Sequence, residues 1–290
     1  MTITLDAWKR SARRLPHRGH DVAYHCGGQG AALLLLHGFP TSSYDYIGQW
    51  EPLAARFFVV SFDMMGYGLS DKPANYAYSI ADQADIAEEL CAALKINRCQ
   101  VLCQDVGDTV CQELLARQHD GSAKVTLERV MLLNGGLFPE THRATPLQQA
   151  LLGPTPERVL SGITRDSFLE GLRRGGLFGP NTVPDRQVLE ATWDLLVRAD
   201  GLQRWPQLIR YIEERQTHRE RWVGALVHAS IPMRLIDGAL DPVSGRHMAE
   251  RYQALIPDAD VTVLDEVGHF PQLEVPHYVL EQALSFFVTQ

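Results

Sequence analysis

Short apolar runs recur through the first half of this 290-residue chain, and each run ends at a polar or glycine-containing loop. The runs cover residues 33–36, 57–62, 101–102 and 130–133. They are apolar on both faces, which is typical of strands buried in a parallel sheet. Helical periodicity lies between them, most clearly in residues 80–94 and 106–118. The alternation predicts an α/β fold with a mostly parallel central sheet flanked by helices.

One long segment interrupts this alternation. Residues 137–227 are rich in Pro, Gly and Arg, and they are helical where they are periodic, in residues 187–199 and 208–226. They contain no convincing strand signal. The segment therefore predicts a helical cap that is inserted into the α/β core.

The strand and helix pattern then resumes. The expected elements are strands at 231–236 and 261–264, a helix from about Ser244 and a last helix over 275–288. The predicted organisation is a core of residues 1–136 and 228–290 with a helical cap of residues 137–227. Because the loops that follow parallel strands meet at the carboxyl edge of the sheet, we expect the chemistry at that edge.

The charge and hydropathy of the chain exclude several kinds of partner. Lys and Arg number 27 and Asp and Glu number 35, so the net charge is −8 and the surface would repel a nucleic-acid backbone. No stretch approaches 18 apolar residues, so no membrane partner is expected. The first residues lack the apolar run of a signal peptide, and the basic cluster between Lys9 and Arg18 is expected to be solvated. We expect a monomer or a homodimer.

The cysteines indicate a reducing, cytoplasmic location. There are five, an odd number, and no pair has the CxxC spacing of a zinc site. Most of them lie in apolar stretches, where a thiol behaves as a small hydrophobic group. We predict no metal and no cofactor.

An aspartate stands where a predicted strand turns into a helix. Asp105 has Cys103 two residues before it and Gly107 two residues after it, which is the small-x-nucleophile-x-Gly pattern of a nucleophile elbow. Small neighbours are needed because the backbone of the nucleophile is strained and the strand and helix approach closely. Taken alone, Asp105 is also consistent with an ordinary helix N-cap. Cys103 fits the pattern less well as a nucleophile, because its second following neighbour is Asp105.

Two backbone amides are the predicted oxyanion donors. The sequence His37-Gly38-Phe39-Pro40 follows the first apolar run, and a glycine turn there can direct an N–H group at a developing negative charge. We expect the backbone N–H groups of Phe39 and Val106 to donate hydrogen bonds to the oxyanion. Taken alone, the loop is also consistent with an ordinary Gly-Pro turn.

An acid and a histidine follow later strands. Asp241 comes just after the strand at 231–236, and His269 comes after the strand at 261–264. Each is unremarkable alone, but the order nucleophile, acid, histidine is that of hydrolases with a strand-ending nucleophile. We predict Asp105, Asp241 and His269 as the catalytic set, with Glu140 as the fallback acid.

Five motifs together carry a family resemblance. They are HGFP (37–40), DMMGYGLSDKP (63–73), the elbow (103–107), GALDP (238–242) and GHFPQLEVP (268–276). In this respect the chain resembles α/β-hydrolases that use an aspartate nucleophile, namely epoxide hydrolases and haloalkane dehalogenases. The segments HGFPTSSYD (37–45), NGGLFPETHR (134–143) and RWVGAL (221–226) resemble more closely the mesoderm-specific transcript proteins and their bacterial relatives. The resemblance implies an α/β-hydrolase fold with a cap.

The chain departs from these families in ways that bear on the substrate. Haloalkane dehalogenases usually carry Trp directly after the nucleophile, where this chain has Val106, and they often carry Asn where it has Phe39. Both differences disfavour a dehalogenase. Epoxide hydrolases usually carry two cap tyrosines, whereas residues 137–230 contain only Tyr211.

An aspartate nucleophile restricts the reaction by itself. Attack on an acyl group would give a labile mixed anhydride, whereas attack on an sp³ carbon gives an ordinary ester. A small, apolar to moderately polar substrate with a strained or good leaving group is therefore expected, together with water. We predict opening of an epoxide to a vicinal diol, with a haloalkane dehalogenase as the alternative. A carboxylesterase-like or non-catalytic protein of the same fold is less favoured, since the elbow has no serine and the set of Asp105, Asp241 and His269 is complete.

The leaving group needs a donor, and the expected cap supplies candidates. Tyr211 could protonate an epoxide oxygen, although a helix-face tyrosine can equally pack into the cap interior. A halide would need indole N–H groups, and Trp193 and Trp205 lie in the cap segment. His37 is also predicted to face the substrate, together with Tyr211, Trp193 and Trp205.

Overall fold

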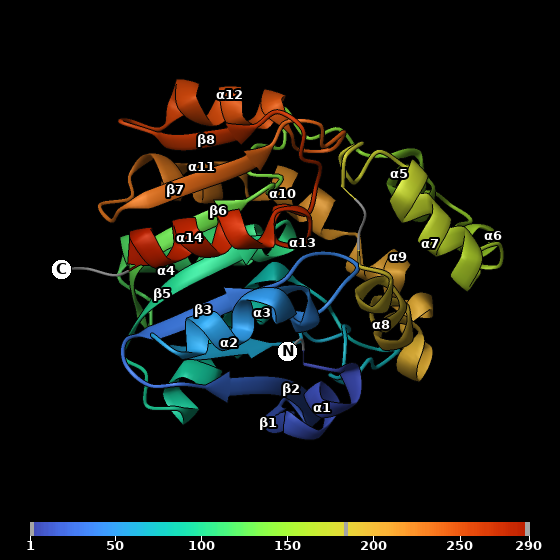
Figure 1. Ribbon diagram of the computed structural model, residues 1–290, viewed down its shortest axis with the longest axis horizontal. Helices are drawn as coiled ribbons and strands as arrows, with labels where there is room; N and C mark the ends of the chain where they lie inside the picture. Colours follow the sequence, from blue (N-terminus) through green and yellow to red (C-terminus); the bar gives the residue numbers. More distant parts are fainter. Residues whose placement is uncertain (1–2, 183–184, 288–290) are drawn as a thin grey trace.

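An eight-stranded sheet forms the centre of the molecule (Figure 1). The computed structural model describes residues 3–182 and 185–287. The strands have the spatial order β1-β2-β4-β3-β5-β6-β7-β8. Their bounds are β1 Arg13–His17, β2 His20–Gly27, β3 Ala32–Leu36, β4 Phe58–Phe62, β5 Arg98–Gln104, β6 Thr126–Leu133, β7 Met233–Gly238 and β8 Asp260–Leu264. The six strands from β3 to β8 confirm the runs predicted from the sequence.

The sheet is parallel except at one edge. The pairs from β4 through β3, β5, β6 and β7 to β8 are parallel, whereas β1 pairs with β2 and β2 with β4 in antiparallel fashion. The basic cluster is exposed, as expected, but it includes residues of the edge strand β1. Arg13 and Arg14 lie in β1, and Arg14 donates a hydrogen bond to the carbonyl of Leu69 at 2.7 Å. Basic side chains project outward from an edge hairpin that hydropathy alone did not reveal.

Helices cover both faces of the sheet. One face carries α3 Ile80–Ala93, α4 Val106–Asp120, α11 Arg219–Val227 and α12 Arg246–Leu255, and the other carries α1 Leu5–Ser11, α2 Ile47–Ala54 and α14 Pro276–Phe287. Each face of the sheet carries an apolar core, and successive residues of β3 point into the two cores in alternation. Leu34 and Leu36 lie in one core, and Leu33 and Leu35 lie in the other. A strand that is buried on both faces must be apolar throughout, which is why the runs are continuous.

Local signals explain where the helices begin and end. Ser79 caps α3 by accepting a hydrogen bond from the Asp82 amide at 3.2 Å, and Gly121 ends α4 in the left-handed region at φ 80°. The predicted last helix is confirmed as α14, and its expected end at residue 288 lies outside the described residues. None of the helices in the described residues is both long and apolar enough to cross a membrane.

A group of short helices lies at one end of the sheet, at the right in Figure 1. These are α5 Pro146–Leu152, α6 Pro156–Leu160, α7 Arg165–Arg174, α8 Arg186–Val197, the 3₁₀ helix η2 Arg198–Arg204 and α9 Trp205–Leu208. The next helix, α10 Tyr211–Thr217, lies nearer the middle of the view. The remaining short elements are the 3₁₀ helix η1 Ser43–Tyr46 and α13 Pro271–Glu274. Residues 208–226, which were expected to be one helix, are divided between α9, α10 and α11. The boundaries of the cap stay a prediction.

Candidate active site

Asp105 occupies a sharp turn between β5 and α4. Its backbone has φ 49° and ψ −107°, and its side chain makes no capping hydrogen bond to the helix. A positive φ is strained for a residue with a Cβ atom, and such strain is concentrated at functional sites. Gly107 permits the turn, because a Cβ atom there would lie 2.3 Å from the carbonyl oxygen of Leu36. The geometry therefore favours an elbow over an ordinary N-cap.

The loop after β3 contacts the Asp105 carboxylate. Leu36 pairs with Cys103 across the parallel strands, so the residues that follow each of them are neighbours. The backbone N–H of Phe39 donates a hydrogen bond to Oδ2 of Asp105 at 3.0 Å. Val106 is the first residue of α4, where backbone N–H groups have no partner within the helix. Both predicted oxyanion donors thus adjoin Asp105.

His269 lies between two carboxylates. Its Nδ1 is 2.7 Å from Oδ2 of Asp241, and its Nε2 is 3.9 Å from Oδ2 of Asp105. Burial lowers the pKa of His269, but the charges of Asp241 and Asp105 and the hydrogen bond to Asp241 outweigh it and raise that pKa to about 9. Because Asp241 accepts at Nδ1, Nε2 is the nitrogen that faces Asp105. The structure thus brings all three predicted residues together.

The sequence reasoning missed the groups that hold Asp241. Its Oδ2 accepts hydrogen bonds from Ser244 Oγ at 2.8 Å and from Asn134 Nδ2 at 3.1 Å, and its Oδ1 accepts from the Val243 amide at 2.8 Å. Burial raises the pKa of Asp241, but His269 and these donors lower it more strongly, so the net shift is downward. Asn134 directly follows β6, and this position at a strand end could have marked it in the sequence as a residue of the site.

Gln104, directly before Asp105, is a second missed residue. Its Nε2 donates to the carbonyl of His269 at 3.1 Å and lies 3.2 Å from His269 Nε2. Gln104 therefore positions the ring of His269 beside the nucleophile.

Arg215 is the third missed residue, and it lies in α10. Only 2% of its surface is exposed. Its Nη2 lies 3.1 Å from the carbonyl oxygen and 3.4 Å from Oδ1 of Asp105, and its Nε donates to Thr109 Oγ1 at 2.8 Å. Its position four residues after Tyr211, on the same face of a helix, was the signal for it.

Tyr211 is buried beside the same carboxylate. Its ring lies 5.9 Å from the ring of Phe39, and the Arg215 guanidinium lies over it at 4.6 Å. Burial and the charge of Asp105 raise the pKa of Tyr211 well above its ordinary value, so the phenol keeps its proton. A cavity of only about 10 Å³ lies against Tyr211 and Val106. An organic substrate therefore requires the helices above it to move apart.

The remaining predicted substrate-facing residues differ in position. The Trp205 ring lies 5.5 Å from the ring of Phe39, whereas Trp193 packs against Phe168 at 5.4 Å. His37 corrects the sequence expectation: its Nε2 accepts from the Met64 amide at 3.0 Å, and its Nδ1 donates to a backbone carbonyl at 2.8 Å. Both ring nitrogens are therefore used to hold loops, and neither is free to meet a leaving group.

Glu140 does not approach the histidine as a fallback acid. Its carboxylate accepts from Arg219 at 2.7 and 2.9 Å and from Arg251 at 2.8 and 3.2 Å. The Arg219 hydrogen bond contributes most to lowering the pKa of Glu140 to about 2. The pair of arginines makes Glu140 a link between α11 and α12, whereas Asp241 contacts His269 Nδ1.

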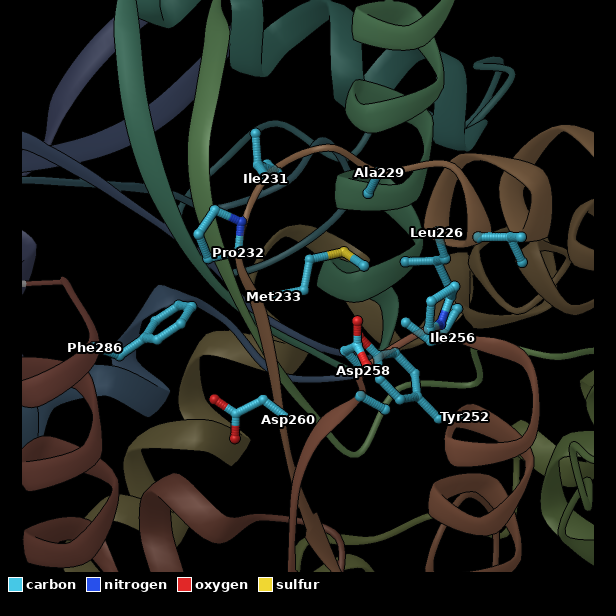
Figure 2. Close-up of a pocket in the computed structure, with 13 residues that line it drawn as sticks. Leu226, Ala229, Ile231, Pro232, Met233, Tyr252, Ile256, Asp258, Asp260 and Phe286 are labelled. Atoms are coloured by element: carbon cyan, nitrogen blue, oxygen red, sulfur yellow. The ribbon is translucent and has the colours of Figure 1, made fainter.

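A larger pocket lies away from this site. It has a volume of about 290 Å³ and is lined mainly by apolar side chains, among them Ile231, Met233 and Phe286 (Figure 2). Met233 and Asp260, which also line it, are the first residues of β7 and β8. The pocket therefore lies at the amino edge of the sheet, opposite the edge that carries Asp105.

Sequence comparisons identify relatives across almost the whole chain. A family model described as the alpha/beta hydrolase fold matches residues 31–276. The mesoderm-specific transcript protein of Mus musculus is 38% identical over 301 residues, which cover 99% of this chain and 88% of that protein. The putative hydrolase LipZ of Mycobacterium tuberculosis is 36% identical over 285 residues, which cover 97% of each chain.

Solved structures share the architecture at lower sequence identity. The epoxide hydrolase CorEH has a TM-score of 0.74 and 22% identity, with coverage of 95% of this chain and 98% of that one. The haloalkane dehalogenase DbeA of Bradyrhizobium elkani has a TM-score of 0.78 and 20% identity, with coverage of 95% and 96%. With its eight-stranded, mostly parallel sheet and this family match, the chain is a hydrolase of the α/β-hydrolase-fold family.

Proposed function

We propose that the protein opens an epoxide to a vicinal diol through an ester on Asp105. The observation that carries the proposal is the carboxylate at the elbow: Asp105 has φ 49° and receives the Phe39 N–H on Oδ2 at 3.0 Å. A serine at this position would indicate acyl transfer, whereas a carboxylate is suited to displacement at an sp³ carbon.

In the first step, Oδ1 of Asp105 attacks an epoxide carbon. The C–O bond of the ring breaks, and its electron pair goes to the epoxide oxygen. Tyr211 is the proposed proton donor to that oxygen, because its phenol is buried, protonated and next to Asp105. A donor at the developing alkoxide stabilises the transition state more than the ground state.

In the second step, water attacks Cγ of the Asp105 ester. His269 Nε2 takes the proton from this water, and Asp241 stabilises the imidazolium that results. The carbonyl oxygen of the ester becomes the oxyanion, and Oδ2 already accepts the Phe39 N–H. The Cγ–Oδ1 bond then breaks, and Oδ1 leaves in the diol with the proton that His269 held. The oxygen from water stays in the Asp105 carboxylate, and its remaining proton restores the Tyr211 phenol.

A halide is the second candidate leaving group. Trp205 favours it, since this tryptophan lies next to Phe39 at the edge of the site and an indole N–H can donate to a halide. Tyr211 also packs against Phe39, and its phenol by itself can donate a proton to an epoxide oxygen. We therefore place the epoxide first.

Isotope labelling under single-turnover conditions tests the covalent route. Enzyme in excess is mixed with styrene oxide, glycidate or 1-bromobutane in ¹⁸O-water, and the peptides are then weighed. We expect ¹⁸O in the peptide that contains Asp105 with an epoxide, and none in Asp105→Asn treated in the same way. Label found only in the product would overturn the ester intermediate. Turnover of p-nitrophenyl acetate without epoxide turnover would indicate an esterase instead.

A further inference from the structure

The buried polar atoms around Asp105 include donors without a partner. Nη1 of Arg215 is buried and makes no hydrogen bond to the described residues, and the same is true of both ring nitrogens of His142. Buried polar groups in folded proteins almost always have partners. Two such groups on one side of the nucleophile indicate that a ligand supplies the missing acceptor.

Arg215 and His142 both approach Gly136. A Cβ atom on Gly136 would lie 2.2 Å from Arg215 Nη1 and 3.0 Å from His142 Nδ1. The two side chains therefore converge beside a residue that has no side chain of its own. Burial, and next the charge of Arg215, lower the pKa of His142 to about 3, so its ring is neutral and can donate one N–H.

The charge of Arg215 changes partners during the proposed reaction. Asp105 is the carboxylate in contact with Arg215, at 3.4 Å. When Asp105 becomes an ester it loses its charge, and the buried guanidinium loses the carboxylate with which it forms an ion pair. A buried charge that loses its partner is costly. An anionic group on the substrate would supply that counter-ion throughout the ester stage.

We propose that Arg215 and His142 form a subsite for a carboxylate on the substrate, so that the enzyme acts on small anionic epoxides. This inference rests on the proposed function, and it departs from the apolar to moderately polar substrate expected from the sequence. In backside displacement, the leaving atom lies on the far side of the carbon from Oδ1. A guanidinium that contacts Oδ1 therefore reaches a substituent of that carbon and not the leaving atom.

Binding without turnover tests the subsite independently of epoxide chemistry. Propionate and propionamide, which have the same shape and differ in charge, are titrated by calorimetry into Asp105→Asn, a variant that imitates the uncharged ester. We expect propionate to bind at least about tenfold more tightly, since a hydrogen bond to a charged group contributes roughly 1.5–3 kcal/mol. Arg215→Gln in the same background should abolish the preference. Equal binding of the two probes, no binding of either, or a preference that survives Arg215→Gln would overturn the proposal.

Two further variants separate the subsite from a general effect of charge or packing. Arg219→Gln is the matched control, because Arg219 pairs with Glu140 on the exposed side, and it should retain the preference for propionate. Gly136→Ala should reduce the preference while the guanidinium is kept, because its Cβ displaces Arg215 Nη1. Loss of the preference in Arg219→Gln, or an unchanged preference in folded Gly136→Ala, would contradict the assigned position.

Kinetics then connect the subsite to the reaction. The ratio of kcat/KM for glycidate to that for glycidamide is measured in the wild type and in Arg215→Gln. We expect the ratio to fall by about 10–100-fold in the variant, following the value of a charged hydrogen bond. An equal loss on both substrates would show that Arg215 positions Asp105 only. Absence of all epoxide turnover, with the propionate preference intact, would refute the proposed function and leave the subsite standing.

Discussion

Asn134 holds Asp241 against the histidine loop. Its Nδ2 donates to Oδ2 of Asp241 at 3.1 Å, while its Oδ1 accepts the N–H of Gly238 at 2.8 Å. Oδ2 of Asp241 is also the oxygen that accepts the hydrogen bond from His269 Nδ1. The side chain of Asn134 therefore joins the ends of β6 and β7 and fixes the acid relative to the base.

Replacement of Asn134 should slow the second chemical step selectively. Asn134 has φ 43°, so Asn134→Gly removes the amide without adding backbone strain. We expect hydrolysis of the alkyl-enzyme to slow by about tenfold, the value of one hydrogen bond to a carboxylate, while alkylation stays near its wild-type rate. Rapid-mixing kinetics on an epoxide separate the two rates. An equal slowing of both steps would show a general disturbance of the fold.

Removal of the base should trap the ester. In His269→Gln the alkylation step keeps Asp105, Phe39 and Tyr211, but no group remains to activate water. Intact-protein mass spectrometry should show an adduct of substrate mass that accumulates. Wild-type protein, which turns the ester over, serves as the control. Normal turnover by the variant would exclude His269 as the base.

Loss of the acid should be less severe than loss of the base. Asp241→Asn leaves the imidazole in place with a poorer partner, and we expect a decrease in turnover of about 10⁴-fold or less, as in other triads. Glu140→Gln should have little effect, because Glu140 contacts Arg219 and Arg251 instead of His269. Steady-state rates of the two variants decide the assignment. A larger effect from Glu140→Gln would reverse it.

Tyr211 distinguishes the two leaving groups. With an epoxide, Tyr211→Phe removes the donor to the developing alkoxide and should slow alkylation by about a hundredfold, or on the order of 3 kcal/mol. With 1-bromobutane the same change should matter little. The phenylalanine keeps the ring that contacts Phe39 and Arg215, so thermal melting should be nearly unchanged. An unaltered alkylation rate on the epoxide would remove Tyr211 from the site.

The pKa of His269 predicts a pH dependence of stability. The folded-state value of about 9 lies above the ordinary value of about 6.5, so the protonated ring stabilises the fold. This contribution is complete below about pH 6.5 and is lost as the pH rises through about 9. Urea unfolding of wild type and His269→Gln between pH 6 and 10 measures it. The stability difference should shrink with rising pH by at most about 3 kcal/mol, and parallel curves would contradict the shift.

The sequence by itself determined the order of the core elements and the residues at the strand ends. Continuous apolar runs identify buried parallel strands because both of their faces must be apolar. Asp105, Asp241 and His269 were predicted to lie together for the same reason, since parallel strands place their following loops along one edge. The sequence did not reveal β1 and β2, because an edge hairpin with exposed arginines has no continuous apolar run.

The tertiary structure alone decided which side chains from distant elements meet. Arg215 reaches Asp105 across 110 residues because residues 208–226 break into separate short helices, and periodicity does not show where a chain turns back. His37 looked available in sequence, yet two backbone groups occupy its ring nitrogens. Hydrogen bonds depend on distances of about 3 Å between atoms, and only the packing of the elements against one another sets such distances.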